Sequence, residues 1–131
     1  MPAGTWRIDA ALPPDQANTA ALAWGLAHYK FGRYKSKPNN ESGKARLTWP
    51  AAADRALVTR LVSAIGLARD LVNTPANDLG PQDLANVAAD LAQKHGAECR
   101  VIAGDALLAE NYPAIHAVGR AAPPAARPTI S

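Results

Sequence analysis

The sequence is poor in several residue types that would identify common classes of protein. Its 131 residues include one cysteine, Cys99, so the chain has no internal disulfide and no cysteine-based zinc pattern. Aromatic residues make up only 5% of the chain. No apolar run approaches the roughly 20 residues of a membrane span, and the first residues, MPAGTWRIDA, lack a signal-peptide core. We therefore expect a soluble cytoplasmic protein with a mainly aliphatic core.

Residues that often carry chemistry are present but scattered. His28, His95 and His116 form neither an HExxH motif nor a pair four residues apart, so zinc binding of that type is unsupported. His95, beside the end of a predicted helix, is expected to have a structural or solvated role. Cys99 is expected to be a small core residue within a strand rather than a nucleophile. No catalytic, cofactor-binding or metal-binding residue can be assigned from these patterns.

The net charge of +3 is concentrated in one segment. Residues 28–46 hold six basic residues and one acidic residue, which leaves the rest of the chain at −2. Because Tyr29, Phe31 and Tyr34 are interleaved with the cations, the stretch 30–46 could bind single-stranded nucleic acid or a protein partner. A solvated loop whose aromatic residues anchor the preceding helix is the more common arrangement, so nucleic acid is not the expected partner.

Hydrophobic periodicity predicts three long helices. In the clearest of them, Asp54 stands where the positive end of the helix dipole favours a carboxylate. The third begins at a Gly-Pro pair and ends before Gly96, a natural stop. The predicted helices span Asp15–Phe31, Ala53–Val72 and Pro81–His95, with a shorter one at 105–110, and the central helix is expected to pack by Leu57, Leu61, Ile65 and Val72.

Short extended segments alternate with these helices. A polar loop is expected at 36–44 and a proline-rich linker at 121–128. The alternation of helices and strands predicts an α/β fold with a mixed or mostly parallel sheet. The predicted strands lie at 5–8, 45–49, 99–103 and 129–131, and residues 114–118 are expected to form a strand or an extended loop.

Three stretches together resemble one enzyme family. They are LAWGLAHYKFGRYK at 22–35, ARDLVNTPANDLGP at 68–81 and YPAIHAVGRA at 112–121. Their order and spacing are similar to those of leucyl aminopeptidases, also called cytosol aminopeptidases. The second stretch is the most specific. A helix that ends in NTPAND and is followed by a Gly-Pro helix start is a more specific pattern than a lone glycine motif. The resemblance extends from about Gly4 to the end of the sequence.

The resemblance implies a two-domain metallopeptidase, of which this chain is a part. Residues 1–52 resemble the end of the N-terminal α/β domain, and residues 53–73 resemble the helix that connects the domains. Residues 74–131 resemble the beginning of the peptidase domain, truncated before the metal site. Family members remove N-terminal residues such as leucine from peptides, and the resemblance also implies a homo-oligomer, a hexamer.

The resemblance implies two divalent metal ions, manganese or zinc, that activate a water molecule. Their ligands lie in a Val-Gly-Lys-Gly segment that runs into Phe-Asp-Thr-Gly-Gly and in an Asn-Thr-Asp-Ala-Glu-Gly-Arg segment, and neither occurs here. We therefore expect this chain alone to be inactive. The alternative is a non-catalytic paralogue or a fragment that uses the stretch 30–46 to bind a partner. The polar residues at 73–77 are expected to end a helix and form a turn rather than a site.

Overall fold

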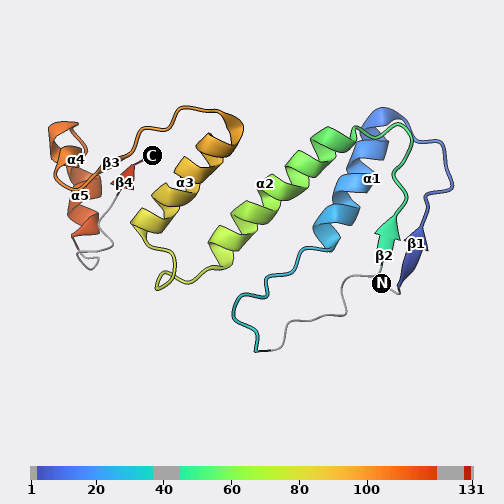
Figure 1. Cartoon of the computed structure of the whole chain (residues 1–131), viewed down its shortest axis with the longest axis horizontal. Helices are drawn as coiled ribbons and strands as arrows, with labels where there is room; N and C mark the ends of the chain where they lie inside the picture. The colour runs from blue at the N-terminus through green and yellow to red at the C-terminus, as the bar shows by residue number, and fades with distance from the viewer. Residues whose placement is uncertain (1–2, 37–44, 121–128, 131) are drawn as a thin grey trace. The chain divides into compact units, whose positions relative to one another are not determined.

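The computed structural model describes residues 3–36, 45–120 and 129–130. The chain divides into two compact units, unit 1 (residues 1–73) and unit 2 (residues 74–131). Figure 1 shows the helices and strands of each unit. Within the described ranges, no helix combines the length and hydrophobicity needed to cross a bilayer. The predicted linker, and all but the first residue of the predicted polar loop, lie outside the described residues.

Two helices make up most of unit 1. α1 (Pro14–Ala27) begins with a proline in its first turn. α2 (Arg55–Asn73) follows Asp54, whose Oδ1 accepts the Leu57 N–H at 2.9 Å. The prediction for α2 is confirmed. The predicted end of α1 at Phe31 is wrong, because the chain leaves the helix at His28 in a tightened turn.

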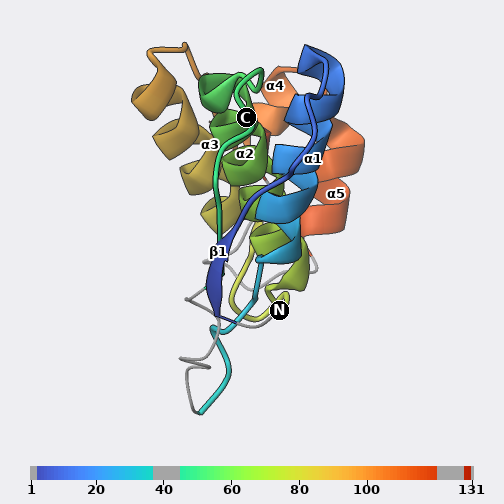
Figure 2. The same cartoon turned by 90° about the vertical axis from the view of Figure 1, so that its right-hand side faces the viewer.

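A short parallel pair of strands completes unit 1. β1 (Gly4–Trp6) pairs in parallel with β2 (Ala45–Leu47), with Gly4 opposite Ala45. The Thr48 N–H donates to the Trp6 carbonyl at 2.8 Å and extends the pairing. Figure 1 shows the two strands beside α1, and Figure 2 shows β1 from another side. The prediction of an α/β fold with parallel strands is therefore confirmed in this unit.

The core of unit 1 lies between α1 and α2. Val58 of α2 is 1% exposed, α1 buries Ala17 and Ala21, and the two helices pack against each other. The expectation that α2 packs by its Leu61 and Val72 side is wrong, because these side chains are 39% and 86% exposed. The sequence has apolar residues both on the row that contains Leu57 and on the row that contains Val58, about 100° further around the helix, so periodicity alone did not decide which row faces α1.

Unit 2 begins with a helix that has clear end signals. α3 (Pro81–His95) starts after Gly80, whose N–H donates to the Asp83 carboxylate at 2.8 Å. It ends at Gly96, which has a φ of 64° in the left-handed region that glycine adopts at low cost. The bounds predicted from the Gly-Pro pair and Gly96 are confirmed. Ala85 is the buried residue of this helix.

The remainder of unit 2 is built from short elements. β3 (Ile102–Ala103) pairs in antiparallel fashion with β4 (Thr129–Ile130). α4 (Ala106–Ala109) and α5 (Pro113–Gly119) follow β3, and α4 buries Leu107 completely.

Two predictions in this unit are wrong. Cys99 is exposed and precedes the strand, which begins only at Ile102. Residues 114–118 lie in α5, because a short aliphatic run after a proline suits a helix start as well as a strand.

Candidate functional site

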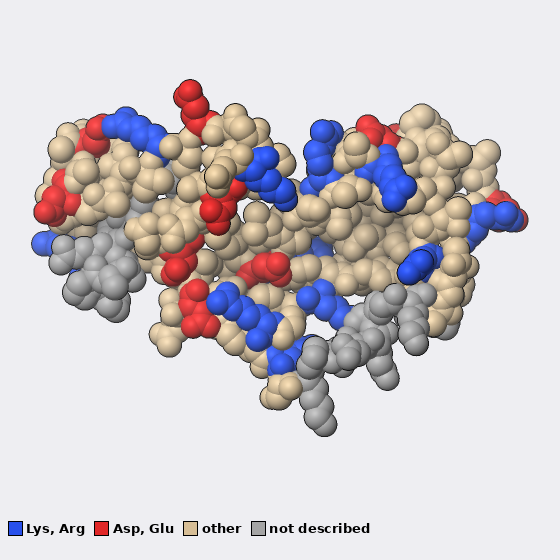
Figure 3. Space-filling model, viewed as in Figure 1, with Lys and Arg blue, Asp and Glu red and all other residues tan. Residues whose placement is uncertain are grey.

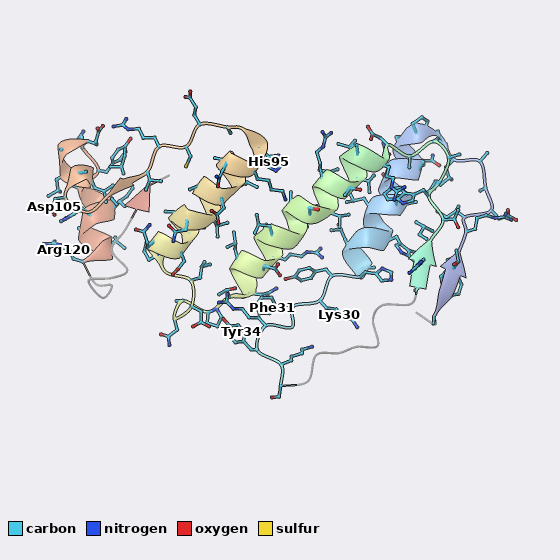
Figure 4. The ribbon with its side chains drawn as sticks, in the orientation of Figure 1. Lys30, Phe31, Tyr34, His95, Asp105 and Arg120 are labelled. Carbon is cyan, nitrogen blue, oxygen red and sulfur yellow. The ribbon has the colours of Figure 1, made fainter. Side chains whose placement is uncertain are left out.

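The titratable residues do not converge on a metal centre. In the part of the chain that the structure describes, no three His, Cys, Asp or Glu residues are close enough to hold a metal ion. Figure 4 shows His95 at the end of α3 and Asp105 before α4, on separate elements of unit 2. The described residues therefore do not fit a dinuclear metal centre, and no step that needs a metal is assigned to them.

His28 and His116 each have a polar partner within their own unit. His28 Nδ1 donates to the Trp24 carbonyl one turn earlier, at 2.8 Å, and closes the end of α1. His116 Nε2 lies 3.3 Å from Asp105 Oδ1, which links α5 to the residue before α4. Arg100 forms a separate ion pair with Glu110 on the surface. These contacts give His28 and His116 structural roles.

Tyr29 anchors the segment after α1 to the last turns of α2. Its hydroxyl donates to Asp70 Oδ1 at 2.8 Å and accepts from Asn73 Nδ2 at 3.1 Å. The Arg69 guanidinium lies 5.3 Å from the centre of the Tyr29 ring and donates to the Leu26 carbonyl at 3.3 Å. Desolvation and the hydrogen bond to Asp70 raise the pKa of Tyr29. We call these four side chains the Tyr29 cluster.

The rest of the basic stretch 30–46 is described only in part. Its first residues place Phe31 and Tyr34 with ring centres 5.8 Å apart and the Arg33 guanidinium 5.7 Å from the Tyr34 ring (Figure 4). On the face shown in Figure 3, basic and acidic side chains of the described residues are interspersed. Because the aromatic residues contact their neighbours and Tyr29 anchors α2, these residues favour the structural interpretation over a nucleic-acid platform.

The residues at 73–77 form a turn. The N–H groups of Asp78 and Leu79 both donate to the Pro75 carbonyl, at 2.9 and 3.0 Å. The side chain of Asn73 bonds to Tyr29 and so belongs to the cluster that fixes the end of α2. No local sequence pattern indicates this partner, which lies 44 residues away in the chain.

A half-open apolar cavity of about 240 Å³ lies in unit 1. Its walls come from α1, from α2 and from the end of β2 with the residues that follow it. Arg55 at the start of α2 stacks over the Trp49 ring, with its guanidinium carbon 5.3 Å from the ring centre. The cavity is lined by Ala21, Trp24, Gly25, Leu47, Trp49, Val58, Thr59, Val62 and Ser63.

One residue in the sequence could have indicated the close approach of the two helices. Gly25 lies inside α1, where glycine costs stability unless something approaches closely. A Cβ atom at this position would lie 2.5 Å from Val62 Cγ2. The cavity itself depends on how α1, α2 and β2 meet, and no local pattern describes that.

Comparison with known proteins identifies the family. The model of the cytosol aminopeptidase family, catalytic domain, matches residues 66–130. The crystal structure of the cytosol aminopeptidase from Coxiella burnetii superposes with a TM-score of 0.77, at 36% sequence identity over 92% of this chain. The chain belongs to the cytosol aminopeptidase family. The probable cytosol aminopeptidase of Streptomyces avermitilis is 34% identical over 89% of this chain.

This cytosol aminopeptidase chain spans about a quarter of the length of those relatives, 26% in each case. A further solved relative, the bottromycin maturation enzyme BotP in complex with Mn, has a TM-score of 0.72 and 30% identity over 95% of this chain. The family membership and the α/β fold predicted from the three sequence stretches are thus confirmed.

Proposed function

We propose that this chain is the inter-domain part of a two-metal aminopeptidase that removes N-terminal residues, such as leucine, from peptides. The observation that carries the proposal is the similarity to the Coxiella burnetii enzyme, which extends over 92% of the chain and through both units. A likeness confined to one unit would be explained by a shared small fold. A likeness that includes both units and the helix before their boundary supports a shared protein.

The proposed division of the chain follows the family pattern. Residues 1–52 would end the N-terminal domain, residues 53–73 would connect the domains, and residues 74–131 would begin the peptidase domain. This assignment is supported by the match of the catalytic-domain model, which begins inside α2 at residue 66.

The role we propose for this chain is to hold elements in place rather than to react with substrate. Asn18 Oδ1 accepts the Asp54 N–H at 2.7 Å and ties the start of α2 to α1. At the other end of α2, the Tyr29 cluster ties Asp70 and Asn73 to the segment after α1. Because both ends of α2 are bonded to α1 or to the segment after it, α2 would keep its position against α1 in the complete enzyme.

The complete enzyme would use two divalent metal ions, manganese or zinc, held by residues other than those described here. The Mn complex of BotP supports manganese. A cytoplasmic homo-oligomer, a hexamer, is proposed on the family resemblance alone.

The test is to read the gene beyond codon 131 and to express the longer product. We expect an in-frame continuation into Val-Gly-Lys-Gly, and manganese-dependent hydrolysis of leucine p-nitroanilide by that product. A well-supported stop codon directly after Ser131 would contradict the proposal and favour a non-catalytic paralogue. A longer product that carries the motifs but shows no metal-dependent turnover would contradict the assigned substrate class.

A further inference from the structure

The apolar cavity of unit 1 combines two features that suit one class of ligand. Its walls are mainly aliphatic and aromatic, and it holds about 240 Å³. An apolar cavity of roughly 150 Å³ is enough to bind benzene. The space in unit 1 therefore suits a single ring or a branched tail of a few carbon atoms.

A cation stands beside this cavity. Trp49 lines the cavity and also lies under the Arg55 guanidinium, 5.3 Å from its ring centre. Among the ion pairs formed by the described residues, none involves Arg55. The nearby Asp54 carboxylate already accepts the Leu57 N–H and caps α2. The guanidinium, with its fork of N–H donors, is therefore available to a carboxylate.

We propose that this cavity binds a small hydrophobic monocarboxylate, with the apolar tail between Trp24, Trp49 and Val62 and the carboxylate on Arg55. Apolar burial supplies attraction without direction, and the guanidinium gives the ligand a fixed orientation. Thr59 and Ser63 add hydroxyl groups to the lining. The site lies wholly in unit 1 and is independent of the metal chemistry proposed for the complete enzyme.

The first experiment titrates the chain with 4-methylpentanoate and, in parallel, with its neutral isostere 4-methylpentanamide. Binding is followed by NMR through the indole N–H signals of Trp24 and Trp49. For a ligand of this size we expect a dissociation constant on the order of 1 mM for the carboxylate. Trp6, which does not line the cavity, serves as the internal reference.

Two variants assign the parts of the site. Arg55→Gln should weaken carboxylate binding about 10-fold and leave amide binding within about twofold, because only the charged ligand loses a charge-assisted hydrogen bond. Arg60→Gln, on the same helix and outside the cavity lining, is the charge-matched control and should change neither. Ser63→Leu should place a larger side chain in the lining and abolish the binding of both ligands.

Two experimental results would contradict the proposal. Equal affinity for carboxylate and amide that is unchanged in Arg55→Gln would remove the guanidinium from the site. The cavity would be ruled out as a ligand site if the indole signals did not move at a large excess of carboxylate while the amide spectrum showed a folded chain. If Ser63→Leu unfolds the chain, the Arg55→Gln and Arg60→Gln pair still decides the question.

Discussion

The two units of this chain differ in how their elements are joined. In unit 1, side-chain hydrogen bonds between residues 36 to 44 positions apart join α1 to α2 at both ends. In unit 2, the side-chain hydrogen bonds formed by Asp83, Gln82, Arg100 and His116 connect residues at most 11 positions apart. Among the described residues, unit 2 also leaves more large apolar side chains exposed: Leu84, Leu91, Val101, Leu108, Tyr112, Ile115 and Val118, compared with Trp6, Tyr34, Leu61 and Val72 in unit 1.

This difference indicates which unit can fold without further polypeptide. Apolar surface left in water contributes nothing to stability, whereas every ordered residue costs conformational entropy that burial has to offset. Unit 1 is therefore expected to be the more stable unit of the isolated chain, and unit 2 to open first. Substitutions that destabilise each unit in turn test this difference.

The largest effect is expected from Val58→Asp. Val58 is 1% exposed between α1 and α2, so the substitution would bury an unpaired carboxylate and destabilise unit 1 by about 3–5 kcal/mol. Leu61→Asp on the same helix is the matched control, because Leu61 is 39% exposed and should cost less than about 1 kcal/mol. Urea denaturation followed by circular dichroism measures both. A larger loss from Leu61→Asp would restore the packing face predicted from the sequence.

The next largest effect is expected from Leu107→Ala in unit 2. Leu107 is fully buried, and truncation should cost about 2–4 kcal/mol. Amide hydrogen exchange should then speed up across α4 and α5 and remain unchanged in α1 and α2. Faster exchange in both units would show that they unfold together, and would contradict the expected difference in stability between unit 1 and unit 2.

Smaller effects, opposite in sign to each other, are expected from alanine substitutions at two helix glycines. A methyl group at Gly25 would meet Val62 at 2.5 Å, so Gly25→Ala should destabilise unit 1 by about 1–2 kcal/mol after the gain in helix propensity. Gly66 has no atom within 4 Å of such a methyl group, and Gly66→Ala should stabilise by about 0.5–1 kcal/mol. Thermal melts compare the pair. A stabilising Gly25→Ala would show that α1 and α2 pack less closely than described.

The sequence predicted the elements whose signals are local. α3 has a Gly-Pro start and a glycine stop, and α2 has a long apolar repeat, so their bounds were nearly right. α5 was missed because a run of five residues does not separate a helix from a strand. The end of α1 was missed because Tyr29 leaves the helix to reach Asp70 and Asn73, more than 40 residues away in the chain.

The candidate site was less predictable for the same reason. The cavity and the Tyr29 cluster join residues from segments that are distant in sequence, and one sequence does not show which residues meet. The metal ligands could not be assigned, because the family motifs that carry them do not occur in the sequence.

The smallest effect is expected from Tyr29→Phe, which removes the hydroxyl bonds to Asp70 and Asn73. Because the folded state raises the pKa of Tyr29 above its usual value, it favours the neutral phenol. The contribution of the cluster should therefore be complete below the ordinary tyrosine pKa and be lost as the pH rises through the folded value. Stability measured from neutral to alkaline pH should fall in the parent chain and fall less in the variant. Equal slopes of stability against pH in the parent chain and the variant would show that Tyr29 does not contribute to the pH dependence.

The most direct test of the central claim is an activity assay of this 131-residue chain. The claim is that its residues position elements of a cytosol aminopeptidase and do not bind the catalytic metals. Purified chain is incubated with leucine p-nitroanilide and added manganese or zinc, and metal binding is followed in parallel by calorimetry. We predict turnover equal to the blank and no stoichiometric metal binding. Metal-dependent turnover well above the blank would contradict the claim.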